Sequence, residues 1–260
     1  MSRTPGVRAT LVTGASSGLG AEMARQLAAL GHPLALCARR TDRLEELRAE
    51  IQARHPGHPV LLRALDVNDH DQVFEVFRGF RDDLAAQGHP LARVVVNAGL
   101  GKGAPLGTGR FDANRETAMT NFVGALAQTE AAMELFREQG SGHLVMVSSI
   151  SAVRGMPKSM ATYAATKAGV AHLVEGLRAE LHGSPYTFTV LYPGYIASEM
   201  NATGPSATPP PLMASTERGV RSMVAAIEAG RDSAYVPGLP WAPLARVIRL
   251  APLPLFRRLV

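Results

Sequence analysis

The feature that most constrains the fold is a regular alternation of short apolar segments with helical segments. Six apolar segments are predicted strands: Val7–Thr13, Leu34–Ala38, Val60–Leu65, Arg93–Asn97, His143–Ser148 and Thr187–Leu191. The helical patterns between them cover Leu19–Leu30, Thr41–Ala53, about Asp69–Gln87, about Asn114–Glu138 and about Ser159–Leu181. Strands this apolar are buried on both faces, as in parallel sheets that helices cover. The sequence therefore predicts an α/β fold with a doubly wound parallel sheet of about seven strands.

Length and composition fit one such domain. The chain has 260 residues, of which 46% are apolar and 19% charged, which does not indicate disorder. The lone Cys37 lies in an apolar segment and cannot form an internal disulfide, which is typical of an intracellular chain. Residues 1–6 lack a signal-peptide pattern, and no apolar run reaches the ~18–20 residues of a spanning helix. We therefore expect a cytoplasmic protein.

A glycine-rich turn, Thr13–Gly20, joins the first strand to the first helix. Small residues let the backbone approach a ligand closely, and a helix N-terminus offers unpaired N–H groups and a positive dipole end. This arrangement suits a pyrophosphate and indicates a Rossmann-type dinucleotide domain. The spacing Gly-x3-Gly-x-Gly differs from the common Gly-x-Gly-x-x-Gly, and no Lys-Ser/Thr follows to make a nucleotide-hydrolysing loop.

The residue after the second strand bears on cofactor choice. An acidic residue about 20 residues past the turn would hold an unmodified ribose hydroxyl. This chain has Arg39 and Arg40 there, and a guanidinium can bind a 2′-phosphate through two N–H donors. The sequence favours NADP(H) over NAD(H), with Arg39 as the phosphate ligand. The alternative, that both arginines are only solvated cap residues, fits Arg40 better than Arg39.

Over roughly Val7–Met200 the chain closely resembles the short-chain dehydrogenase/reductase family. The turn Thr13–Gly20 is followed, in the family's order, by further matching motifs: Leu65-Asp66-Val67, Asn97-Ala98-Gly99, Asn121, Ser148-Ser149, Tyr163-Ala164-Ala165-Thr166-Lys167 and Pro193-Gly194. The resemblance implies an oxidoreductase that moves a hydride between a nicotinamide cofactor and a carbonyl or alcohol. It also implies a homodimer or homotetramer packed through the helices at Asn114–Glu138 and Ser159–Leu181.

The resemblance assigns roles residue by residue. The implied catalytic residues are Asn121, Ser149, Tyr163 and Lys167. Asp66 would bind the adenine amino group. The implied cofactor-binding residues are Gly14, Ser16, Ser17, Gly18, Leu19, Gly20, Arg39, Asp66, Val67, Asn97, Ala98, Gly99, Tyr163, Lys167, Pro193, Gly194, Ile196 and Ser198.

One spacing departs from the family. Thirteen residues, 150–162, separate Ser149 from Tyr163, whereas the family commonly has twelve. Spacing alone would put Ile150 in the catalytic place, where it could not act. We assume one inserted residue around Lys158–Thr162 and keep Ser149, with Ser148 and Ser151 as alternates.

These residue types suit carbonyl reduction. The oxygen that gains negative charge needs a hydrogen-bond donor and finally a proton, and Tyr163 can supply both. Lys167 lies one helical turn further on, so its charge would favour tyrosinate and so lower the ordinary tyrosine pKa of about 10. Ser149 would donate a second hydrogen bond to that oxygen, and Asn121 would hold a water that links Lys167 to solvent.

Other functions find less support. The eight histidines are scattered and no cysteine pair exists, so no metal site is expected. The net charge of +5 is not gathered into a recognised nucleic-acid motif. A non-catalytic dinucleotide sensor or scaffold stays the alternative to an enzyme.

We divide the chain into a cofactor-binding and catalytic domain, residues 1–240, and a basic, apolar tail, residues 241–260. Within the domain, residues 195–215 include the Pro-rich stretch Asn201–Met213, interpreted as a substrate loop or alternatively as a disordered insertion. With Leu100–Phe111 it would form the pocket walls. Five apolar residues predict an apolar substrate such as a lipid-like, steroid-like or acyl-chain carbonyl: Met156, Tyr195, Met200, Leu212 and Met213. The tail either forms a short amphipathic helix that rests on a membrane surface or closes over the pocket, or it packs against the body or a second subunit.

Overall fold

The computed structural model describes residues 6–199 and 212–259, and its described part holds one seven-stranded sheet. All neighbouring strands are parallel, in the order β3-β2-β1-β4-β5-β6-β7. The strands are β1 (Ala9–Thr13), β2 (Leu34–Ala38), β3 (Val60–Ala64), β4 (Leu91–Val96), β5 (Gly142–Val147), β6 (Tyr186–Pro193) and β7 (Ser233–Val236). The order reverses between β1 and β4, which creates a crevice at the carboxyl ends of these strands.

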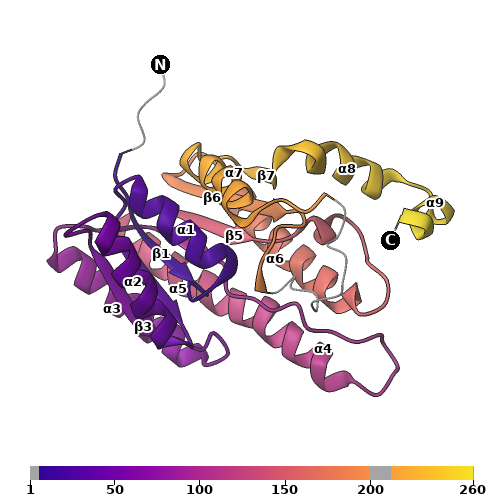
Figure 1. Ribbon diagram of the computed structural model, residues 1–260, viewed down its shortest axis with the longest axis horizontal. Helices are drawn as coiled ribbons and strands as arrows, with labels where there is room; N and C mark the ends of the chain where they lie inside the picture. Colours follow the sequence, from indigo (N-terminus) through magenta and orange to yellow (C-terminus); the bar gives the residue numbers. More distant parts are fainter. Residues whose placement is uncertain (1–5, 200–211, 260) are drawn as a thin grey trace.

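Helices cover both faces of the sheet, as Figure 1 shows. They are α1 (Gly18–Ala29), α2 (Thr41–Arg54), α3 (His70–Ala86), α4 (Phe111–Ala118), α5 (Gly124–Gln139), α6 (Met160–Glu180), α7 (Thr216–Glu228), α8 (Gly238–Leu250) and α9 (Leu253–Leu259). A π-helical turn, η1 (Met119–Val123), joins α4 to α5, and a 3-10 turn, η2 (Ile150–Val153), follows β5. The doubly wound α/β fold expected from the sequence is confirmed.

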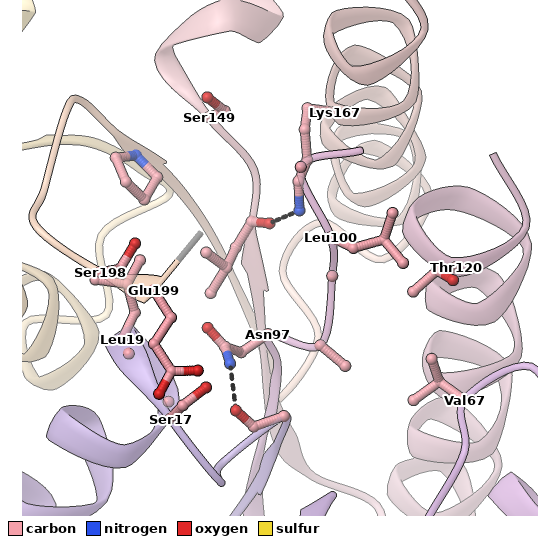
Figure 2. Close-up of a pocket in the computed structure, with 18 of the residues that line it drawn as sticks. Ser17, Leu19, Val67, Asn97, Leu100, Thr120, Ser149, Lys167, Ser198 and Glu199 are labelled. Carbon is pink, nitrogen blue, oxygen red and sulfur yellow. Dashed lines mark hydrogen bonds between the residues drawn. The ribbon is translucent and has the colours of Figure 1, made fainter. Parts of the chain in front are cut away.

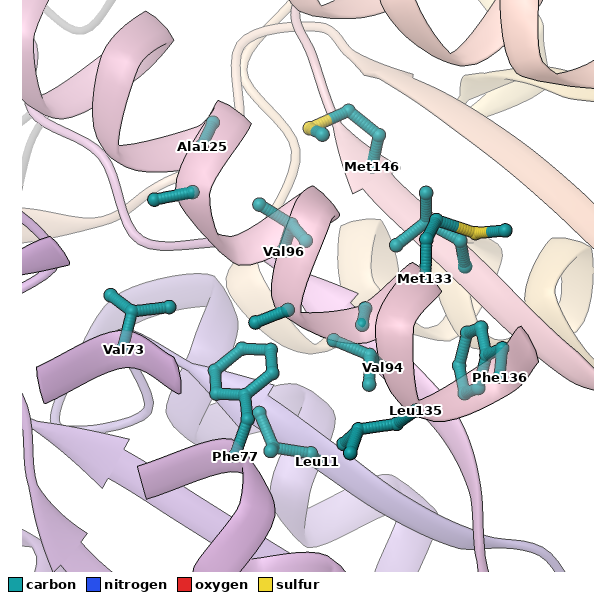
Figure 3. Packing of buried hydrophobic residues seen from close by; sticks show 14 of the residues in the cluster. Leu11, Val73, Phe77, Val94, Val96, Ala125, Met133, Leu135, Phe136 and Met146 are labelled. Carbon is teal, nitrogen blue, oxygen red and sulfur yellow. The ribbon is translucent and has the colours of Figure 1, made fainter. Parts of the chain in front are cut away.

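Alternate strand residues supply the two cores. Leu11 and Val94 lie in the cluster under α3, α5 and α6, whereas Val12 and Val95 lie in the cluster under α1, α2 and α7. Figure 3 shows the first cluster, with Phe77 of α3 near Leu11 and with Val94 and Val96 facing α5. Burial on both faces explains why these strands read as continuous apolar runs.

Most predicted bounds agree with the structure within one or two residues, and Leu34–Ala38 agrees at both ends. The predicted helix Asn114–Glu138 begins earlier, at Phe111, and contains the π turn η1. The predicted Pro-rich loop Asn201–Met213 lies outside the described residues except for Leu212 and Met213.

The C-terminal tail packs on the body of the domain beside η2. Trp241 and Ala245 of α8 form a cluster with Ile150, and Phe256 of α9 lies under the guanidinium of Arg154 at 4.4 Å. Figure 1 shows α8 and α9 at the end of the molecule opposite α2 and α3. The helical structure is interrupted between α8 and α9, at Ala251 and Pro252.

Candidate active site

A cavity of about 400 Å³ opens at the carboxyl ends of β1, β4, β5 and β6. Figure 2 shows Ser17 and Glu199 at one end of this cavity and Ser149 and Lys167 at the other. Of the predicted site residues, all except Asn121 line it. Five residues for which the sequence predicted the pocket wall or an alternate serine also line it: Leu100, Gly101, Tyr195, Ser148 and Ser151. The residues that line the cavity and had no predicted place in the site are Cys37, Ala38, Arg40, Leu65, Asn68, Thr120, Val147, Ile150, Met160 and Glu199.

The glycine-rich turn forms the floor of one end. Gly14 and Gly18 have positive φ angles of 63° and 54°, a conformation that glycine adopts without strain. A Cβ on Gly20 would lie 2.4 Å from the carbonyl oxygen of Gly14. Ser17 precedes α1 without capping it through its side chain, so the first N–H groups of the helix stay available to an anion.

Asn97 fixes the turn to the strand beside it. Its Nδ2 donates to the carbonyl oxygens of Thr13 at 2.9 Å and Gly14 at 3.3 Å. The Thr13 hydroxyl accepts from the backbone N–H groups of Asn97 and Ala98 at 3.0 and 3.1 Å. These bonds join β1 to β4 at the crevice.

Both Arg39 and Arg40 line the cavity, although only Arg39 was expected to. Arg40 donates through Nη2 to the Ser17 hydroxyl at 2.7 Å and through Nη1 to Glu199 at 3.3 Å. Glu199 follows β6 and was not predicted, because it is 159 residues away from Arg40 in the sequence. Within the described residues, Arg39 forms no ion pair.

Asp66 and Val67 lie past β3 at the same end of the cavity. The Asp66 carboxylate accepts from the backbone N–H of Asn68 at 3.0 Å, which folds the loop back on itself. The Asn68 side chain then bonds Thr120 of η1 at 3.2 Å. Neither Asn68 nor Thr120 stood out in the sequence, since polar residues in loops and helices are common.

The serines after β5 face different ways. The Ser149 hydroxyl accepts from the Ser151 hydroxyl at 3.0 Å and also bonds Tyr163. The Ser148 hydroxyl instead donates to the backbone carbonyl of Lys167 at 2.7 Å. Ile150 packs in the cluster with Trp241. Lys158, in the segment where an inserted residue was expected, has a positive φ of 57°.

Tyr163 and Lys167 lie one turn apart on α6, where Lys167 is buried and Tyr163 is half-buried. The Lys167 Nζ is 5.9 Å from the centre of the Tyr163 ring and donates to the carbonyl oxygen of Val147 at 2.9 Å. Burial lowers the pKa of Lys167 to about 8. Burial also raises the pKa of Tyr163, although its hydrogen bond with Ser149 acts in the opposite direction.

Asn121 lies in the π turn η1 and its side chain binds the loop after β4. Its Oδ1 accepts from the N–H of Leu100 and its Nδ2 donates to the carbonyl oxygen of Leu100, both at 2.8 Å. Gly99 must pass close by, because a Cβ there would lie 3.1 Å from the Asn121 Oδ1 and 3.4 Å from the Lys167 Nζ. The Asn121 side chain thus fixes the backbone of the loop after β4, at Gly99 and Leu100, close to Lys167.

The segment after β6 forms the last wall. A Cβ on Gly194 would lie 2.1 Å from the Trp241 ring, so only glycine lets the tail approach here. Ile196 is buried and pairs with Ala214 as an isolated bridge. Tyr195 lines the cavity and packs edge-on against Trp241, whereas Met156 packs beside Ile248 in the tail and does not line the cavity.

No group of three His, Cys, Asp or Glu side chains in residues 6–199 and 212–259 is placed to hold a metal ion. No helix within these ranges is long and apolar enough to cross a membrane.

The sequence and the fold of this chain both match known proteins. The sequence model described as short chain dehydrogenase matches residues 8–208. An uncharacterized oxidoreductase of Mycobacterium tuberculosis is 52% identical over 248 residues, which cover 95% of each chain. A short chain dehydrogenase from Burkholderia cenocepacia, solved in complex with NADP, is 26% identical with a TM-score of 0.81, and the match covers 99% of each chain.

Solved neighbours hold both forms of the nicotinamide cofactor. Besides that NADP complex, a short chain dehydrogenase/reductase from Burkholderia phymatum was solved with NAD. It has a TM-score of 0.78 at 21% identity, and the match covers 94% of this chain and 92% of that one. The comparisons support a nicotinamide dinucleotide without choosing between the two.

Proposed function

Because the chain belongs to the short-chain dehydrogenase family and is an oxidoreductase of that family, we propose that it reduces a carbonyl or oxidises a secondary alcohol with NADP(H). The observation that carries the proposal is one hydrogen-bonded set at the end of a dinucleotide-sized cavity. In it Ser149 bonds Tyr163, and Lys167 lies beneath the Tyr163 ring.

The cavity fits a dinucleotide. The cradle at Gly14 and Gly20 has no room for a Cβ, and the N-terminus of α1 faces it with free N–H groups. Asp66 and Val67 would hold the adenine, and Arg39 would bind the 2′-phosphate. Pro193, Gly194, Ile196 and Ser198 would border the nicotinamide. When bound there, NADP(H) supplies or accepts the hydride.

The residues of this chain would handle the proton. Tyr163 would give its hydroxyl proton to the substrate oxygen, while Ser149 would stabilise negative charge on that oxygen with a hydrogen bond. Burial alone raises the pKa of Tyr163, so positive charge is needed to favour tyrosinate. The Lys167 ammonium is the nearby group that can provide it, and Asn121 would hold a water that lets Lys167 exchange protons with solvent.

The substrate end of the cavity supports an apolar substrate. Leu100, Ile150, Met160 and Tyr195 line it beside the reacting hydroxyls. Burying these side chains against an alkyl or ring system contributes about 25 cal/mol for each Å² of apolar surface. A lipid-like, steroid-like or acyl-chain ketone or aldehyde fits this lining. Rates across a panel of such carbonyls and small polar sugars test it, and a preference for the sugars would refute it.

The cofactor part is tested by fluorescence titration with NADPH and NADH. We expect markedly tighter binding of NADPH, and Arg39→Ala should weaken NADPH about tenfold or more while leaving NADH nearly unchanged. Such a loss corresponds to one charge-assisted phosphate contact of about 1.5–3 kcal/mol. Equal affinities in the wild type would refute the NADP(H) preference and leave the reductase standing.

The proposal includes assembly as a homo-oligomer through α4, α5 and α6. Phe111, Met119 and Phe122 are exposed on or next to these helices by 73%, 37% and 38%. These exposed apolar side chains support an interface with a second copy. A monomeric mass by light scattering would refute it.

The proposal also includes a cytoplasmic location, which rests on the single buried thiol of Cys37.

We further propose that the outer side of the tail makes peripheral contact with a membrane. Leu250 and Leu253 are exposed there by 79% and 60%, beside exposed Arg246 and Arg249. Flotation of the whole chain with anionic liposomes should be lost in Leu250→Ser. Equal behaviour of the two proteins would refute the contact.

A further inference from the structure

The carboxylate of Glu199 lies across one end of the cofactor cavity. It accepts from the guanidinium of Arg40 at 3.3 Å and from that of Arg43 at 2.5 Å. These arginines lie at the start of α2, whereas Glu199 follows β6 on the other side of the cavity. Figure 2 shows Glu199 and Ser17 extending toward the same point at this end.

The same place is polar in a manner that suits a phosphate. Arg40 reaches the hydroxyls of Ser16 and Ser17, and Arg39 lines the cavity beside them. A guanidinium binds carboxylates and phosphates with the same pair of N–H donors. Glu199 therefore occupies guanidinium donors beside Arg39 that could also bind a ribose 2′-phosphate, and its charge has the same sign as the phosphate.

The Glu199 contacts hold the carboxylate in its charged form. The hydrogen bonds from Arg43 and Arg40 lower the pKa of Glu199, so it is ionised throughout the neutral range. The side chain is 56% exposed, which lets it move away into solvent when a competing anion arrives. Exposed ion pairs of this kind are weak, so exchange of one anion for another is accessible.

We propose that Glu199 sets cofactor specificity by competing with the 2′-phosphate for Arg40 and Arg43. The inference rests on the proposed function and adds a residue to it. Glu199 reduces the preference for NADP(H) that the arginines create, because its carboxylate must be displaced before a 2′-phosphate can bind. NAD(H) carries no 2′-phosphate and leaves the ion pairs intact.

The test is the ratio of the dissociation constants for NADH and NADPH, measured by fluorescence titration in wild type and Glu199→Gln. The substitution keeps the size of the side chain and removes its charge. We expect NADPH to bind about three- to tenfold tighter in the variant, in line with the modest strength of exposed charge pairs. NADH binding should stay within about twofold of wild type on the same reasoning.

Two controls separate this effect from a general change of surface charge. Glu217→Gln removes another exposed carboxylate, which pairs with Arg221 on α7 and does not line the cavity, and should leave the ratio unchanged. In a background that carries both Arg40→Ala and Arg43→Ala, Glu199→Gln should have a much smaller effect, because both ion pairs that it disrupts are already broken.

An unchanged ratio in Glu199→Gln, or weaker NADPH binding, would overturn the proposal, the latter because it would make Glu199 a support for the arginines. The same measurements test the proposed NADP(H) preference separately from the role of Glu199. A wild type without preference that gains one in Glu199→Gln would refute that preference but support the role of Glu199. A preference that Arg39→Ala abolishes and Glu199→Gln leaves unchanged would do the reverse.

Discussion

At the scale of single residues, the three serines after β5 show how far sequence reasoning reaches. The family spacing pointed to Ile150, and residue chemistry pointed to Ser149 with two alternates. In the structure Ser148 bonds the backbone of Lys167, Ser151 bonds Ser149, and Ser149 alone of the three bonds Tyr163. Sequence could not separate them, because which way a hydroxyl points depends on the turn that follows the strand.

Replacing each serine distinguishes these positions. Ser149→Ala should lower kcat by about 10²–10³, since it removes a hydrogen bond to the developing charge. Ser148→Ala should cost about 1 kcal/mol of stability from its lost bond to Lys167 and have a much smaller effect on kcat. The rate of NADPH consumption with an accepted carbonyl measures both. A larger loss of kcat in Ser148→Ala would assign the role to Ser148.

At the scale of elements, the periodic patterns predicted the strands and the helices well, because burial on one or both faces leaves a clear record in the sequence. The π turn η1 was not predicted, since one extra residue in a helical turn hardly changes the pattern. The pairing of Glu199 with α2 was also missed, because it depends on how β6 and β2 are placed by the whole sheet.

The close packing at the junction of β1 and α1 predicts that Gly20 cannot be replaced without loss of cofactor binding. Gly20→Ala should abolish most NADPH binding and lower Tm, because the new Cβ would lie 2.4 Å from the Gly14 oxygen and 2.7 Å from the Asn97 Nδ2. Gly176→Ala on α6 is the matched control, since its Cβ would meet nothing within 4 Å. There alanine should stabilise by about 0.5–1 kcal/mol. NADPH affinity and Tm near wild type in Gly20→Ala would contradict the tight cradle.

At the scale of the whole molecule, a buried polar cluster joins the amino ends of several strands to α7, on the edge of the sheet opposite the cavity. Fully buried Arg93 donates to Glu228 at 2.7 Å and to His143 at 3.3 Å. Burial works against the charge of Glu228, but its bonds from His32 and Arg93 outweigh burial and lower its pKa to about 2. Burial, with Arg93 nearby, lowers the pKa of His143 to about 3.

Both shifts make the fold sensitive to acid. The stability that depressed pKa values contribute is complete above the unfolded values of 6.5 for His143 and 4.5 for Glu228. It is lost as pH falls through the folded values of about 3 and about 2, because the unfolded chain binds the protons first. Tm should therefore fall from pH 6.5 downward. In His143→Gln the fall between pH 6.5 and 5 should be shallower, and an unchanged slope would exclude His143 as its source.

The central claim, that Tyr163 carries the proton in a hydride-transfer reaction, is tested most directly by Tyr163→Phe. NADPH affinity and carbonyl-dependent NADPH oxidation are measured on the same preparation of wild type and variant. The account predicts that NADPH affinity stays within about threefold while turnover falls by about 10²–10⁴, the usual contribution of a general acid. A variant that binds NADPH and keeps most of the wild-type rate would contradict the account.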